Sequence, residues 1–212
     1  MNILKTFFAT VCAAVLLVSC NGTSSLLGTQ MDTEEGVQKV VDILSKNIDT
    51  KEWKIVEVRW SDDELSNNVE FVVVDMVNKD GRPYTQAFVG AIGFAPGDLS
   101  EARTTFYKAD PKDIPAIDLS KIDAKRIVAN IEAAKKMIPQ EYQFKSLADY
   151  RLSNTEKDPD KEETFTINVT EKGKETVRSA GKESLVYYEI EFQVNKDGKV
   201  FSPTLKNLEN EE

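Results

Sequence analysis

The stretch VNKDGRPYT occupies residues 77–85, and the similar VNKDGKVFS occupies residues 194–202. In both, Asp and Gly lie between runs rich in β-branched and aromatic residues, which indicates a β-hairpin. Gly allows the positive φ that a two-residue turn of the primed type requires, so we expect such a turn here. The preceding residues align at the same spacing: Val69 with Val186, Phe71 with Tyr188, and Val73 with Ile190. This agreement predicts an internal duplication.

Each copy begins with a predicted helix. Asp32 and Glu35 form a capping box, after which apolar residues recur at helical spacing as far as Ile48. The second helix opens near Ser120 and stops before Pro139. After the first helix, the apolar set of the strand at residues 53–60 changes parity at Ile55 and Val56, which predicts a β-bulge.

We therefore predict an α+β fold of two tandem repeats, each with one helix packed on an antiparallel sheet of three to five strands. The second copy is longer, and we place one inserted hairpin in its excess, around Gly173. The predicted organisation is a lipoprotein signal peptide (1–19), a flexible tether (20–31), the first repeat (32–92), a connection (93–118), the second repeat (119–205) and an acidic tail (206–212).

The first twenty residues predict export. Lys5 precedes an apolar run at residues 7–18, which is too short for a permanent membrane span and suits a signal-peptide core. The run ends in Leu17-Val18-Ser19-Cys20, which resembles the lipobox of bacterial lipoproteins. The resemblance implies that Cys20 becomes a lipid-modified N-terminus. The alternative is an ordinary signal peptide cut at a small residue.

The cysteine count agrees with lipidation. Cys12 lies inside the apolar run, so Cys20 would be the lone cysteine after processing and no disulfide could form within one chain. Residues 21–29 are rich in Gly, Ser and Thr, which indicates a flexible tether. In lipoprotein families an Asp directly after the lipidated Cys favours the inner membrane. Asn21 stands there instead, so the resemblance implies an outer-membrane location, facing the periplasm.

A helix laid across an antiparallel sheet, repeated in an exported chain, resembles the PepSY and β-lactamase-inhibitor-like group of small periplasmic domains. The resemblance lies in the order of the elements. It implies two α+β units whose sheets can join into one broad curved surface, with a role in binding or inhibiting another protein. Cystatin-like folds and nuclear-transport-factor-like folds share the same plan.

The composition argues against several kinds of chemistry. The net charge of −9 repels phosphate backbones, so we expect no nucleic-acid partner. The chain has no histidine, and Cys20 would be its lone mature cysteine, so the commonest general base and the usual zinc ligands are missing. We therefore predict no catalytic residues, no cofactor and no metal. The acidic clusters at residues 62–64 and 158–163 lack the glycine-centred loop that wraps calcium.

One difference between the copies bears on function. In residues 186–194 apolar and polar side chains alternate, as in a strand with one face in water. At the corresponding water-side positions the first copy has Val72, Val74 and Met76. Either residues 93–118 or the second repeat covers this apolar face, or the face, together with Trp60, binds a hydrophobic ligand or a partner protein. The second hypothesis predicts that Val74→Asp leaves the domain folded while abolishing partner capture.

The function predicted from the sequence is a membrane-anchored periplasmic lipoprotein that binds an unknown envelope protein, peptide or polymer without catalysis. The alternative is an accessory protein for a small molecule or glycan, with a pocket between the lobes lined by Trp53, Trp60 or Tyr142. A hydrolase that works with carboxylates alone is a third interpretation, because it needs only two acids that fold close together.

Overall fold

The computed structural model describes residues 29–63, 65–102, 112–153, 163–179 and 182–205. The predicted signal peptide, Cys20 and the acidic tail lie outside these ranges. The first part of the chain contains α1 (Glu34–Asn47), β1 (Lys54–Ser61), β2 (Phe71–Val77), β3 (Pro83–Val89), η1 (Gly90–Ile92), β4 (Ser100–Glu101) and η2 (Leu119–Lys121). The second part contains α2 (Ala124–Lys135), β5 (Tyr142–Ser153), β6 (Glu163–Glu171), β7 (Thr176–Ser179), β8 (Lys182–Leu185), β9 (Tyr188–Val194) and β10 (Val200–Phe201).

Both predicted helices form, and a capping side chain sets the residue at which each helix begins. The side chain of Thr33, one residue after the predicted Asp32, accepts a hydrogen bond from the backbone N–H of Gly36 and opens α1. Gly36 is required there, because a Cβ atom would lie 2.0 Å from the carbonyl oxygen of Gln30. Asp123 caps α2 in the same way, and the predicted start at Ser120 lies instead in the preceding 3-10 turn η2.

The two Asn-Lys-Asp-Gly stretches form hairpins, as predicted, but their turns differ from the two-residue primed type. The N–H of Asn78 donates to the carbonyl of Arg82 (3.0 Å), and Gly81 is the turn residue with positive φ (79°). Asn195 bonds to Lys199 in the same pattern, with Gly198 at φ 74°. Each Asn side chain accepts two turn N–H groups, which stabilises a three-residue loop with Gly in its left-handed position.

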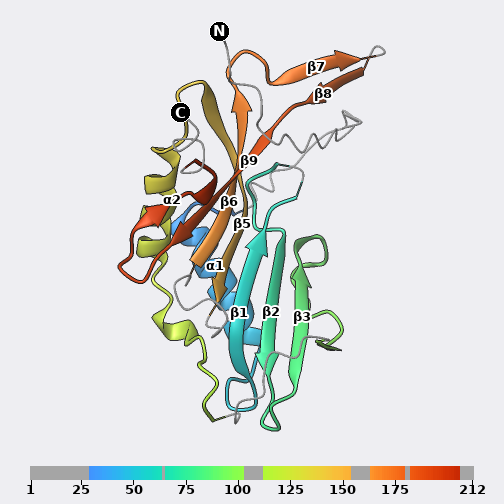
Figure 1. Cartoon of the computed structure of the whole chain (residues 1–212). Helices are drawn as coiled ribbons and strands as arrows, with labels where there is room; N and C mark the ends of the chain where they lie inside the picture. The colour runs from blue at the N-terminus through green and yellow to red at the C-terminus, as the bar shows by residue number, and fades with distance from the viewer. Residues whose placement is uncertain (1–28, 64, 103–111, 154–162, 180–181, 206–212) are drawn as a thin grey trace.

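The expectation of two tandem repeats is wrong, because the chain builds one continuous sheet. The eight strands run in the order β10-β9-β6-β5-β1-β2-β3-β4, and β1 pairs with β5 over five residue pairs from Glu57↔Ser153 to Ser61↔Asp149. Figure 1 shows the sheet passing without a break from β3 to β9, with α1 and α2 on one side. The α+β class is correct, and residues from both predicted repeats enter one core.

The two hairpins also present matching residues to opposite faces of the sheet. Val194 lies in the main core beneath the helices, in the cross-strand row that contains Val74. Val77, its counterpart in the duplicated stretch, lies on the other face, where it packs with Val56 and Ile114. The shared turn sequence therefore specifies a local hairpin and does not specify which side of the sheet its strands bury.

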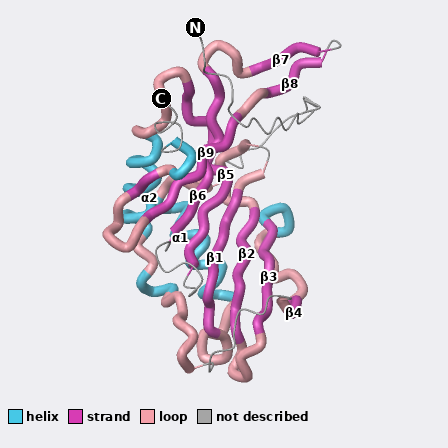
Figure 2. The backbone as a smooth tube through the Cα atoms, in the orientation of Figure 1, coloured by secondary structure: helices cyan, strands magenta, loops and turns pink. Residues whose placement is uncertain are grey.

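The inserted hairpin is displaced from its predicted place. β6 is a central strand that pairs with both β5 and β9, so the residues before Gly173 belong to the main sheet and not to an inserted hairpin. The separate hairpin is β7–β8, a two-stranded sheet that projects from the end of the main sheet (Figure 2). The predicted bulge in β1 is confirmed, since the register with β2 shifts between Ile55 and Glu57.

The core contains a row of stacked aromatic rings that crosses four neighbouring strands under the helices. Trp60 stacks on Tyr150 (4.7 Å between ring centroids), Tyr150 on Phe165 (5.0 Å), and Phe165 on Phe192 (5.5 Å). All four side chains are at most 1% exposed. Because Trp60 and Tyr150 come from opposite sides of the β1–β5 seam, the stack ties the two halves of the sheet together.

Candidate functional site

The four residues of the predicted recognition face are core residues. Trp60 and Met76 are 1% exposed, and Val72 and Val74 are fully buried. They belong to the same core cluster as residues of both helices, such as Val40 and Ile131. The parity of β2 is therefore opposite to the one predicted. The elements that cover this side are α1 and α2, and α2 belongs to the second predicted repeat, which was one of the two covers expected. Phe94 and Ile117, from residues 93–118, pack against the same cluster.

We call the opposite side of the sheet the open face. Its residues are identified from the pairing of neighbouring strands, because paired residues share a face. Across the middle of the sheet the open face presents Glu57, Arg59 and Ser61 of β1, Phe71, Val73 and Asp75 of β2, Thr85, Ala87 and Val89 of β3, Asp149 and Arg151 of β5, Thr164 and Thr166 of β6, and Glu189 and Glu191 of β9. Within the described ranges, both α-helices lie on the other side (Figure 1).

One part of the open face is apolar. Phe71 pairs with Val89, and Val73 pairs with Ala87, so these four side chains form one patch across β2 and β3. All four are half-buried, unlike the fully buried Val72 and Val74 on the helix side. A sheet face in contact with water is normally polar, so this patch departs from that pattern.

The adjoining part of the open face is charged. Arg59 lies opposite both Val73 and Arg151, so Arg59 borders the apolar patch and Arg151 lies one strand further from it. Arg151 donates to the carboxylate of Glu57 at 2.5 Å, whereas Arg59 is exposed. Beyond them, β9 presents the exposed Glu189 and Glu191. The open face therefore changes from an apolar patch on β2 and β3, through charges of both signs on β1 and β5, to acidic side chains on β9.

Asp149 lies at the centre of this face, and its environment is unusual for a surface carboxyl. Burial is the main cause that raises the pKa of Asp149, and it outweighs the hydrogen bond from Thr166 and the attraction of Arg59. The pKa of Asp62 is also raised, again mainly by burial, with a contribution from the negative charge of Asp149. Burial thus raises the pKa of both carboxyls, which lie just after the last residue of β1 and in the middle of β5.

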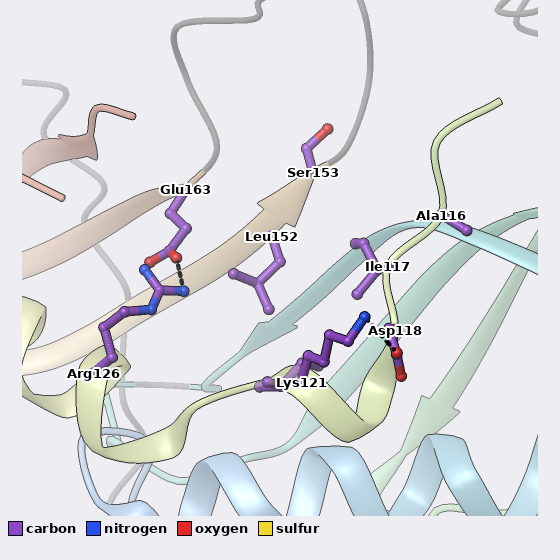
Figure 3. A pocket seen from close by; sticks show the side chains of 9 residues that line it. Ala116, Ile117, Asp118, Lys121, Arg126, Leu152, Ser153 and Glu163 are labelled. Atoms are coloured by element: carbon purple, nitrogen blue, oxygen red, sulfur yellow. Dashed lines mark ion pairs between the residues drawn. The ribbon is translucent and has the colours of Figure 1, made fainter. Parts of the chain in front are cut away.

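A pocket of about 370 Å³ lies on the helix side, where the ends of β5 and β6 meet the start of α2. Figure 3 shows Arg126 reaching from α2 to Glu163, with Leu152 pointing into the space between Arg126 and Lys121. Glu163 is 2% exposed, and both of its carboxylate oxygens have partners. One oxygen forms an ion pair with Arg126, and the other accepts hydrogen bonds from Tyr150 (2.5 Å) and Asn130 (3.2 Å).

Asn67 is a structural residue between β1 and β2 that no motif in the sequence singles out. It has positive φ (60°) and is 7% exposed. Its amide nitrogen donates to Gln30 (2.8 Å) and Asp32 (2.7 Å), and its amide oxygen accepts from the N–H of Leu147 (2.8 Å). Asp32 also pairs with Lys135 at 2.6 Å, which links the start of α1 to the end of α2.

The aromatic residues predicted to line a glycan pocket do not come together. Trp53 packs edge-on against Tyr84 (5.2 Å), and Tyr142 packs edge-on against Tyr188 (5.5 Å). Trp60 is in the core stack. None of the three lines the pocket beside Arg126.

The predictions on lipidation, metal binding and membrane spans concern residues that the structure describes only in part. Cys20 and most of the 158–163 cluster belong to the undescribed part. In the described ranges, no group of three or more acidic residues is placed to hold a metal ion. No described helix has the length and apolar character needed to cross a membrane. Comparisons with protein families, with curated proteins and with solved structures found no match.

Proposed function

We propose that the chain is a membrane-anchored envelope lipoprotein, held through Cys20, whose open face binds a partner protein or peptide without catalysing a reaction. The observation that supports this proposal most is the apolar patch of Phe71, Val73, Ala87 and Val89. It lies on the side of the sheet opposite both described α-helices. Burying such a patch against a partner is favourable at about 25 cal/mol per Å² of apolar surface removed from water.

The chemistry beside the patch suits a protein partner. Protein interfaces combine an apolar centre with arginine and aromatic residues, and here Phe71 lies next to a strand that carries Arg59. An arginine at the border can bind backbone carbonyls or carboxylates of the partner. The glycan alternative predicted from the sequence has less support, because Trp53 and Tyr142 pack against other tyrosines instead of lining a cleft.

Photo-crosslinking tests this proposal. A benzophenone-bearing amino acid is placed in the full-length chain at Thr85, on the open face, and in matched forms at the exposed helix positions Lys46 and Lys125. We expect a discrete adduct in envelope preparations from the Thr85 form alone, and its loss on introduction of Val73→Asp. Equal adducts from the helix positions, or an adduct that survives Val73→Asp, would contradict the use of the open face.

The anchor is tested separately. We expect Cys20→Ser to abolish incorporation of radiolabelled palmitate and to release the protein from the membrane fraction, while a purified form that begins at residue 29 stays folded. Label retained by Cys20→Ser would contradict lipidation at this residue and would leave the proposal for the open face intact.

A further inference from the structure

The pocket beside Arg126 has the chemistry of a binding site that is distinct from the open face. It lies on the helix side of the sheet, and its walls come from η2, the first turn of α2, the ends of β5 and β6, and residues 116–118. Its volume of about 370 Å³ is within the range of small-molecule sites, which runs from roughly 300 to 1,000 Å³.

Glu163 positions the arginine of this pocket. Its carboxylate is 2% exposed and is held by Tyr150 and Asn130, so the ion pair with Arg126 has a fixed geometry. The Arg126 side chain is 45% exposed, and a guanidinium has five N–H donors. The pairing with Glu163 therefore orients Arg126 and leaves part of its planar donor edge accessible from the pocket.

The remaining walls define the rest of the ligand. Lys121 is 81% exposed and forms an ion pair with Asp118 at 3.3 Å. Ile117, Ile122 and Leu152 supply apolar surface between the two cationic side chains. The two cations and two carboxylates among the lining residues sum to zero net charge. Asp118 and Glu163 would repel a dianion more strongly than a monoanion.

We propose that this pocket binds a small carboxylate with an aliphatic body, the carboxylate on Arg126 and the aliphatic part against Ile117, Ile122 and Leu152. A carboxylate matches the fork of a guanidinium, and a chain of a few methylene groups matches the apolar wall. The site needs no metal or cofactor and does not depend on occupancy of the open face.

The probe is hexanoate, titrated into the purified chain and followed by calorimetry and by amide chemical shifts. Hexanoate is expected to bind at least tenfold more tightly than hexanamide or hexyl phosphate, because one loses the charge and the other is a dianion. We expect Arg126→Gln to weaken hexanoate binding about 10- to 100-fold, the value of a hydrogen bond to a charged group. Equal binding of hexanoate and hexanamide, or no binding of hexanoate, overturns the proposal.

Two further variants complete the test. Arg151→Gln is the matched control, because Arg151 is 46% exposed and pairs with a glutamate on the open face, and it is expected to leave the affinity for hexanoate unchanged. The double variant Arg126→Gln with Glu163→Gln removes both charges, so no unpaired charge is left buried to unfold the chain. If this double variant folds and binds hexanoate as the original chain does, the assignment to Arg126 is wrong.

Discussion

Neighbouring valines on β2 separate the buried face from the open face, since Val74 and Val73 point to opposite sides of the sheet. Val74 is 0% exposed and pairs with Val58 in the core. Val74→Asp loses the burial of a valine, about 1.5 kcal/mol or more. It also buries a carboxylate, which costs several kcal/mol. Together these approach or exceed about 5 kcal/mol, the lower end of domain stability. We therefore expect Val74→Asp to be unfolded.

Val73→Asp is the matched variant on the open face. Val73 is half-buried and pairs directly with Arg59, so an aspartate there stays in contact with water and gains an opposite charge across the strands. Such a pair contributes roughly 0.2–1 kcal/mol. This gain offsets much of the lost apolar burial, and we expect a net destabilisation of about 1 kcal/mol.

The assay is urea denaturation of the untethered chain, followed by far-ultraviolet circular dichroism and by the fluorescence of Trp53 and Trp60. A cooperative transition is expected for Val73→Asp and none for Val74→Asp. The reverse outcome, with Val74→Asp folded and Val73→Asp unfolded, would show that the assignment of the two faces is inverted, and the proposal for the open face would be lost with it.

Three further predictions concern the hydrogen bonds of Asn67, the carboxyl group of Asp149 and the row of stacked aromatic rings. Asn67→Asp replaces an amide donor by a carboxylate that faces Asp32, and we expect urea denaturation to show a loss of about 2 kcal/mol or more. Asp149→Asn is expected to stabilise the chain at neutral pH. Because the folded pKa of Asp149 is raised, the original chain should approach the variant's stability as the pH falls from neutral toward 3.8; an unchanging gap between them would contradict this pKa. Phe165→Leu removes ring contacts with two neighbours, worth about 0.5–1.5 kcal/mol each, and should lower the denaturation midpoint without changing the far-ultraviolet spectrum.

Features encoded by neighbouring residues were predictable from the sequence. The Asn-Lys-Asp-Gly stretches form hairpins because the Asn side chain and the glycine act within five residues. The helices follow from a periodic apolar face, and their starts are correct to within a few residues because several residues near each start are able to cap. The bulge in β1 was visible because two adjacent apolar residues, Ile55 and Val56, break the alternation of the strand.

Features encoded by distant pairing were not predictable in this way. β2 carries apolar side chains on both faces over residues 71–74, so its sequence gives no parity. The prediction assigned the faces of β2 by alignment with the second hairpin, in which Val194 faces the helices. Val77, the residue aligned with Val194, faces the other side of the sheet. What fixes the helix side of β2 is the pairing of Val74 with Val58, which is in turn opposite Leu152, and no local pattern reports that contact.

The pocket was hidden for a related reason. Glu163 ends the acidic run at residues 158–163, and by composition it resembles a solvated loop residue. It becomes a buried carboxylate only because β6 begins there, because Leu152 lies opposite on β5, and because α2 brings Asn130 and Arg126 over the end of both strands. A buried charge that must be paired constrains its partner, so the fold that removes Glu163 from water also fixes the direction of Arg126. The orientation of this arginine is therefore a consequence of tertiary packing, and the binding behaviour proposed for it should disappear when the packing of α2 on the sheet is lost.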